Sequence, residues 1–126
     1  MTFHQAGTPV AFLYTADRER ALGFYCETMG FALKSSDPFG DFLDLGPAVA
    51  RLTMLPDYKA GAHPVLGWNV DDIKGAVSAL AARGVEFSNY EGMGQDELGI
   101  WTAPDGAAKV AWFADPDGNV LSLSEA

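Results

Sequence analysis

Few side chains in this sequence could do chemistry, and they do not form a recognisable catalytic group. His4 and His63 are the only histidines, and Pro64 after His63 is typical of a linker. Both histidines are therefore expected in exposed loops rather than at a metal ion. Cys26 has no histidine at helical spacing, so we expect a packed thiol rather than a nucleophile.

Acidic side chains near turns form the second chemically interesting group. Asp115 and Asp117 belong to a Pro-Asp-Gly turn, where carboxylates mostly accept hydrogen bonds from the local backbone. Glu91, Asp96 and Glu97 lie in a glycine-rich stretch, where they are either solvated or able to attract a cation. The sequence contains no phosphate-binding loop, nucleophile elbow or zinc-ligand spacing, so the catalytic residues are unknown.

The composition indicates a small folded protein with an acidic surface. Of the 126 residues 48% are hydrophobic, which allows one domain with a core and excludes a disordered acidic chain. The 17 acidic and 8 basic residues give a formal net charge of −9. This charge argues against nucleic acid or a membrane surface as a partner, because both require a basic face. The excess of acids serves solubility or favours a cationic ligand.

Nothing in the sequence points to secretion or to a membrane. The single cysteine excludes an internal disulfide. There is no basic-then-apolar leader and no apolar run of about 18 residues. A cytoplasmic location is therefore expected.

The same order of elements occurs twice in the chain. Residues 10–17 and 65–72 each combine an apolar strand with an acidic helix start. In the first module, at about residues 7–58, Asp17 caps a helix that Gly30 ends. The strands predicted for this module are 9–14, 31–35, 41–45 and 49–55.

A linker at about residues 56–64 leads to the second module, at about residues 65–125. Asp71 or Asp72 caps its helix, which Gly84 ends. Its predicted strands are 65–70, 85–90, 98–103, 108–114 and 120–124. Glycines within residues 91–105 make this insertion a candidate lid. The sequence therefore predicts a single α+β domain over residues 1–126, in which two βαβββ modules form a curved mixed sheet around a cavity.

These elements resemble the vicinal oxygen chelate superfamily, which contains glyoxalases, bleomycin-resistance proteins and extradiol dioxygenases. The matching segments span nearly the whole chain and are residues 17–25 (DRERALGFY), 29–31 (MGF), 70–73 (VDDI) and 115–121 (DPDGNVL). No single segment is specific, and the set in its order carries the resemblance. The resemblance implies a homodimer, with a small molecule as the ligand.

Metal-dependent members of this superfamily hold a divalent ion on the first and last strands of their modules. The resemblance places these four ligand positions at Val10, Leu52, Val65 and Ser122. Valine and leucine have no lone pair, and a serine hydroxyl is a poor ligand unless it is deprotonated. We therefore expect the scaffold of the family without its metal ion and without a cofactor.

Period-two alternation assigns side chains to the cavity that the resemblance implies. It puts Val10, Phe12 and Tyr14 on the ligand-bearing face of the first strand. The other expected lining residues are Leu52 and Met54 from the first module and Asn69, Trp101, Ser122 and Ser124 from the second. The pattern does not assign the faces of Trp101 and Trp112. Such a lining is typical of a small-molecule pocket, unless the side chains fill the space themselves.

The leading hypothesis is a metal-independent binding protein that sequesters an aromatic or amphipathic small molecule. Similar metal-lacking members of the superfamily bind planar or glycopeptide antibiotics as homodimers. One alternative is a metal-dependent lyase, isomerase or dioxygenase with an unconventional site, or an acid–base enzyme that uses Tyr14, Tyr90 or Glu91. Another alternative is an accessory domain whose sheet edge binds a protein partner.

Overall fold

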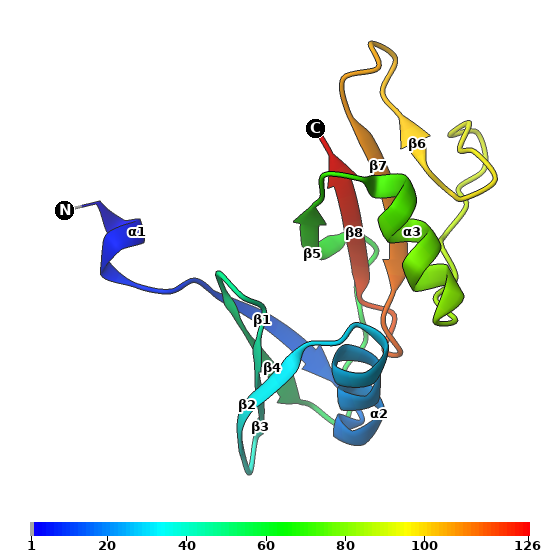
Figure 1. Ribbon diagram of the computed structural model, residues 1–126. Helices are drawn as coiled ribbons and strands as arrows, with labels where there is room; N and C mark the ends of the chain where they lie inside the picture. Colours follow the sequence, from blue (N-terminus) through cyan, green and yellow to red (C-terminus); the bar gives the residue numbers. More distant parts are fainter. Residues whose placement is uncertain (1) are drawn as a thin grey trace. The chain divides into compact units, whose positions relative to one another are not determined.

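The computed structural model describes residues 2–126, except for the side chain of His4. The expectation for the His4 side chain therefore lies outside the described residues. The chain divides into two compact units, Met1–Lys59 and Ala60–Ala126, called unit 1 and unit 2 below (Figure 1). No helix in the described part of the chain is long and apolar enough to span a membrane.

Unit 1 contains a strand, a helix and three further strands, preceded by one helical turn that the sequence did not predict (Figure 1). Its elements are α1 (Phe3–Ala6), β1 (Val10–Thr15), α2 (Arg18–Leu22), the π-helical continuation η1 (Gly23–Thr28), β2 (Ala32–Asp37), β3 (Gly40–Asp44) and β4 (Val49–Met54). The sheet order is β1-β4-β3-β2, in which β1 and β4 are parallel and the other pairs antiparallel. This is the predicted βαβββ arrangement.

The helix of unit 1 begins and ends where the sequence predicts. The Asp17 carboxylate accepts a hydrogen bond from the backbone N–H of Arg20 at 3.1 Å, which satisfies one free donor of the first turn. After the last turn, Gly30 has a φ of 84°, a left-handed conformation that glycine adopts without strain. Ala21 and Tyr25 are fully buried, which identifies the helix face that packs in the core.

Unit 2 repeats this order of elements. They are β5 (Pro64–Asn69), α3 (Ile73–Ala82), β6 (Trp101–Thr102), β7 (Lys109–Ala114) and β8 (Val120–Glu125). The sheet order is β5-β8-β7-β6, again with one parallel pair, β5 and β8. Asp72, not Asp71, caps α3 and accepts a hydrogen bond from the N–H of Gly75 at 3.0 Å. Helix α3 packs on β7 and β8 (Figure 1).

The segment between α3 and β7 differs from the sequence prediction. The strand predicted at 85–90 does not form, and the strand predicted at 98–103 is reduced to the two residues of β6. Within residues 85–90, the β-pairing is limited to one isolated antiparallel bridge between Phe87 and Phe113 of β7. Residues 85–100 therefore form a loop that lies against the sheet rather than an additional strand.

The side chain of Gln95 stabilises this segment as a loop. Its Nε2 donates hydrogen bonds to the carbonyls of Ser88 at 2.8 Å and Gly99 at 2.7 Å. Its Oε1 accepts a hydrogen bond from the backbone N–H of Tyr90 at 2.7 Å. These bonds pair three backbone groups of the loop with one side chain and stabilise its conformation, while the N–H of Ser88 still donates to the carbonyl of Trp112 on β7 at 2.8 Å.

In each unit, one face of the sheet is buried and the other is not. The buried apolar residues of unit 1 are Leu13, Ala21, Tyr25, Leu43, Ala50 and Leu52. Those of unit 2 are Ile73, Val77, Val85, Ile100, Ala111, Phe113, Leu121 and Leu123. The opposite face of each sheet carries half-buried and exposed side chains, and we call it the open face.

Candidate functional site

The open face of the unit 2 sheet brings tryptophans together with small polar side chains. Directly paired residues of neighbouring strands point to the same side of a sheet, so the register assigns these side chains to faces. The two rows on the open face are Gly67, Ser122 and Trp112, and Asn69, Ser124, Val110 and Trp101. The pairing therefore settles the faces of Trp101 and Trp112, which the sequence left unassigned.

Three aromatic rings are in contact on this face. The ring centroids of Trp101 and Trp112 are 6.4 Å apart, with their planes at 43°. Tyr90 lies edge-on to Trp112, at a centroid distance of 5.7 Å and an interplanar angle of 79°. These tilted and edge-to-face pairs fix the rings, which remain partly exposed and can stack on a planar ligand. We call these rings, with Asn69, Ser122 and Ser124, the aromatic face.

Neutral polar groups lie beside the rings. The Ser124 hydroxyl donates a hydrogen bond to Oδ1 of Asn69 at 3.4 Å. Ser122 is half-buried and pairs with Gly67 on β5. A Cβ atom at Gly67 would collide with the Ser122 Oγ, so the glycine makes room for this hydroxyl. The named polar groups of the aromatic face are thus neutral hydroxyls and an amide.

Replacing Gly67 with alanine tests this close approach. We expect Gly67→Ala to displace the Ser122 hydroxyl while changing the free energy of unfolding by less than about 1 kcal/mol, because a small surface side chain can rotate. Urea unfolding measures the stability, and the Cβ chemical shift of Ser122 reports the displacement. Gly61→Ala is the matched control, since a Cβ there meets no atom within 4 Å. An unchanged Ser122 signal would contradict the expectation.

The open face of the unit 1 sheet carries an arginine between two phenylalanines. Arg51 of β4 pairs with Phe12 of β1 on one side and with Phe42 of β3 on the other. Phe12 is 63% exposed, whereas its neighbour Leu13 is buried, which confirms the alternation predicted for β1. Tyr14 is half-buried on the same face, with its ring centroid 5.7 Å from that of Tyr58.

The Arg51 guanidinium makes two interactions on this face. Its Nη2 donates to Oδ1 of Asp37 at 2.9 Å, and its Cζ lies 4.6 Å from the ring centroid of Phe42. The hydrogen bond from Arg51, assisted by the backbone N–H of Phe39, lowers the pKa of Asp37. The carboxylate therefore stays ionised at neutral pH, and the ion pair orients the guanidinium.

The structure corrects the expected positions of Leu52 and Met54. Leu52 pairs with Leu13 and is fully buried, so it faces the core and not the face of Phe12. Met54 pairs with Thr15, which is also buried, so it belongs to the same face as Leu52, although its side chain is exposed at the end of β4. The open-face position that the sequence analysis missed is Arg51. A single charge inside the apolar stretch 49–54 was the signal that could have revealed it.

The residues at the expected metal positions do not fit a metal ion. Val10 and Val65 are exposed hydrocarbon side chains, and Ser122 offers only a hydroxyl. On β4 the open face presents Arg51, a permanent cation without acceptor atoms. Among the side chains that the structure describes, which exclude that of His4, no three from His, Cys, Asp or Glu gather into a group that could hold an ion.

Three other sequence candidates lie where the sequence analysis expects them. Asp115 is buried, and its carboxylate accepts hydrogen bonds from the N–H groups of Asp117 and Asn119 at 3.0 and 2.9 Å, as the turn predicts. Burial raises the pKa of the half-buried Cys26 thiol, which favours the protonated form over the nucleophilic thiolate. His63 is exposed before β5, as expected.

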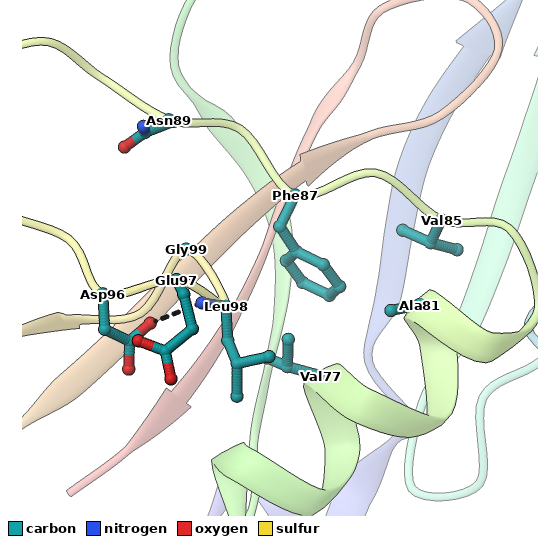
Figure 2. A pocket seen from close by; sticks show the side chains of 9 residues that line it. All are labelled: Val77, Ala81, Val85, Phe87, Asn89, Asp96, Glu97, Leu98 and Gly99. Atoms are coloured by element: carbon teal, nitrogen blue, oxygen red, sulfur yellow. Dashed lines mark hydrogen bonds between the residues drawn. The ribbon is translucent and has the colours of Figure 1, made fainter.

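A pocket of about 280 Å³ lies between α3 and the loop at 85–99 (Figure 2). Val77 and Leu98 contribute to its apolar wall, and Asp96 and Glu97 lie at its rim. The Asp96 Oδ1 accepts hydrogen bonds from the N–H groups of Leu98 and Ile100, both at 2.9 Å. Asp96 therefore stabilises the loop through these hydrogen bonds. The other acidic residue that lines the pocket, Glu97, is exposed.

Comparison with solved structures gives the same fold over almost the whole chain. A glyoxalase/bleomycin resistance protein/dioxygenase superfamily member from Sphaerobacter thermophilus is 27% identical, with a TM-score of 0.71 over 95% of this chain and 97% of that one. TnmS3, an antibiotic binding protein from a Streptomyces species, is 25% identical, with a TM-score of 0.66 over 94% of each chain. A superfamily protein from Alicyclobacillus acidocaldarius is 17% identical and shares the fold, with a TM-score of 0.73 over 94% and 90% of the two chains.

The sequence itself also matches a family model. Among curated proteins, no sequence matches this chain. The model of the Glyoxalase/Bleomycin resistance protein/Dioxygenase superfamily matches residues 4–123, nearly the full length. The two βαβββ units and their mixed sheets agree with this match. The chain is therefore a member of the glyoxalase/bleomycin resistance protein/dioxygenase superfamily.

Proposed function

We propose that this protein is a metal-independent binding protein for planar aromatic small molecules. The observation that carries the proposal is the aromatic face, on which Trp101, Trp112 and Tyr90 are fixed by mutual contact and remain partly exposed. A planar ligand that stacks on these rings replaces water over their π faces and gains dispersion contacts. Ser122, Ser124 and Asn69 orient the ligand through hydrogen bonds.

The relationship to TnmS3 supports this proposal. That protein is an antibiotic binding protein and shares 25% identity with this chain along 94% of its length. Sequestration requires affinity and abundance but no catalytic group. Such a role suits the aromatic face, whose named polar groups are neutral hydroxyls and an amide, and it suits a unit 2 sheet in which the family metal positions hold Val65 and Ser122.

A fluorescence titration tests the proposal. The three tryptophans supply the signal, and the ligands are a panel of planar polycyclic compounds, including quinone-type antibiotics. We expect saturable quenching by at least one compound, with a stoichiometry of one ligand per chain. Aliphatic compounds of equal size are the control, and we expect no saturable response from them. Failure of every planar compound to quench would contradict the proposal.

Elemental analysis distinguishes this role from an enzyme of the same superfamily, because the superfamily contains both kinds of protein. The protein is purified without chelator, and its metal content is measured per chain. A stoichiometric divalent ion coordinated by protein side chains would contradict the metal-independent role. The homodimer that the resemblance implies and the cytoplasmic location expected from the sequence stay predictions.

A further inference from the structure

The pocket between α3 and the loop at 85–99, called the α3 pocket below, lies on the side of the unit 2 sheet opposite to the aromatic face. Phe87 of this pocket pairs with the buried Phe113 of β7, and their ring centroids are 5.3 Å apart. Paired residues point to the same side of a sheet, whereas Trp112, next to Phe113 in β7, points to the other side. Helix α3 packs on β7 and β8 and contributes the buried Val77 to the pocket. The role proposed for the aromatic face therefore does not use this pocket.

The walls of the α3 pocket are apolar, and an alanine on the helix leaves space between them. Val77 and Ala81 are four residues apart in α3, so they lie on the same side of the helix, one turn apart. Val77 is 1% exposed, whereas Ala81 is exposed to solvent. Figure 2 shows the Phe87 ring directed towards α3, between the side chains of Leu98 and Val85. The cavity of about 280 Å³ lies at the lower end of the volumes that small-molecule sites have.

Hydrogen bonds hold the loop wall of the α3 pocket in place. Besides the bonds to the Asp96 carboxylate, the N–H of Gly99 donates to the carbonyl of Asp96 at 3.0 Å. The carbonyl of Gly99 accepts the bond from Nε2 of Gln95 at 2.7 Å. Gly99 has a φ of 85°, and a Cβ atom there would lie 3.1 Å from the Cβ of Phe87, so a glycine lets this turn approach Phe87 closely. Because these contacts fix the wall, binding of a ligand requires little ordering of the chain.

The rim of the α3 pocket is acidic. Asp96 and Glu97 lie at the rim, and none of the described residues that line the pocket is basic. In the described part of the chain, the exposed Glu97 carboxylate takes part in no ion pair or hydrogen bond, so it is available to a cation. The formal net charge of −9 also favours the approach of a cation and opposes that of an anion. Apolar walls below an acidic rim are complementary to an amphipathic cation.

We infer that the α3 pocket is a second ligand site, which binds a small apolar molecule that carries an ammonium group. The apolar part replaces water at the walls formed by Val77, Phe87 and Leu98, and the ammonium group pairs with Glu97 at the rim. A volume of about 280 Å³ corresponds to roughly nine water molecules at about 30 Å³ each, so one saturated ring with its amine fits. The inference does not depend on the role proposed for the aromatic face, because it concerns the other side of the sheet.

A nitrogen-15 NMR titration with cyclohexylmethylammonium chloride at pH 7 tests the inference, and neutral cyclohexylmethanol is the matched probe of nearly equal shape. The amine is cationic at this pH, as a lysine side chain is. We expect it to shift the backbone N–H signals of Val77, Leu98 and Gly99 along a saturable curve. It should bind at least about fivefold more tightly than the alcohol, which corresponds to about 1 kcal/mol. The indole N–H signals of Trp101 and Trp112 should stay in place.

Two variants with matched controls separate the charge from the cavity. Glu97→Gln should reduce the preference for the amine to less than about twofold. Glu91→Gln, at an exposed acid of the same loop that does not line the pocket, removes the same charge and should keep the full preference. Ala81→Leu should weaken binding of both probes at least about tenfold, because the larger side chain occupies the cavity. Ala79→Leu, at an exposed alanine of α3 outside the pocket, should bind both probes as the native protein does.

The inference is overturned if the amine shifts no signal of the pocket residues, binds no more tightly than the alcohol, or binds to Ala81→Leu as tightly as to the native protein. Shifts confined to the indole signals would place the amine on the aromatic face and would also overturn it. The amide spectra show whether each variant is folded, and Glu97→Gln, at an exposed side chain, keeps the test decisive if Ala81→Leu does not fold. The proposed function is tested with planar ligands at Trp101 and Trp112, so the two ideas can fail separately.

Discussion

Replacing Asp41 with asparagine is expected to lower the free energy of unfolding by about 2–4 kcal/mol, because it breaks an ion pair whose carboxylate is buried. Asp41 of β3 lies on the buried face of the unit 1 sheet, with its side chain 1% exposed. Its two carboxylate oxygens accept hydrogen bonds from Nε and Nη2 of Arg18 at 3.2 and 2.9 Å, and Ser36 donates a third at 2.6 Å. The pair joins the start of α2 to the sheet, so unit 1 depends on it.

Urea unfolding of the native protein and the Asp41→Asn variant at pH 7 measures this loss. Asp57→Asn, at an exposed loop residue, is the matched control and should change the free energy of unfolding by less than about 0.5 kcal/mol. An Asp41→Asn variant as stable as this control would show that the buried pair contributes nothing net. That outcome is known for some buried ion pairs and would contradict our account of unit 1.

The same carboxylate makes stability depend on pH. Burial alone would raise the pKa of Asp41, but the hydrogen bonds and charge of Arg18, with the Ser36 hydroxyl, outweigh it and lower the pKa. A carboxyl group with a lowered pKa in the folded state stabilises the protein above its unfolded value of about 3.9. This contribution is lost as the pH falls through the folded value. The free energy of unfolding of Asp41→Asn should therefore fall less between neutral and acidic pH than that of the native protein. The decrease that remains is due to groups such as Asp37, whose pKa is also lowered.

Replacing Trp112 with alanine should weaken binding of a planar aromatic ligand at least about tenfold, because central aromatic anchors dominate binding energy. Trp112 contacts both Trp101 and Tyr90, so its removal takes away one stacking surface and frees the other two rings. Calorimetric titration with the compound found by the fluorescence panel measures the effect without relying on tryptophan emission.

Trp112→Phe is the control for this prediction, since it keeps an aromatic ring at the same position. It should bind within a few-fold of the native protein, whereas Trp112→Ala should not. Circular dichroism of both variants establishes that unit 2 remains folded. Equal affinity of the alanine variant and the native protein would place the ligand away from the aromatic face.

The elements with strong local signals were predictable from the sequence. Asp17 and Gly30 mark the start and the end of the first helix. A short carboxylate accepts a hydrogen bond from the first turn, and a glycine adopts the left-handed conformation that ends a helix. The alternation in β1 and β5 was also readable, because Leu13 and Leu66 occupy positions that a buried face requires. The superfamily and the α+β order of its modules followed from these signals together.

The missed features depend on partners outside the segments concerned. The face of Leu52 is set by its pairing with Leu13 of β1, and a one-residue error in register exchanges Leu52 with Arg51. The segment at 85–90 has the composition of a strand, but the side chain of Gln95 bonds the carbonyl of Ser88 and the N–H of Tyr90. Neither the face of Leu52 nor the loop conformation at 85–90 can be recognised from the sequence pattern of the segment itself.

The central claim, that the aromatic face binds the ligand, is tested most directly by the indole N–H signals of the three tryptophans in a nitrogen-15 NMR titration. Trp101 and Trp112 lie on the open face of unit 2, whereas Trp68 pairs with the buried Leu123 on the opposite face and serves as an internal reference. We predict that a planar ligand found by the fluorescence panel shifts the signals of Trp101 and Trp112 and leaves that of Trp68 in place. A titration that saturates while Trp101 and Trp112 remain unshifted would contradict the claim.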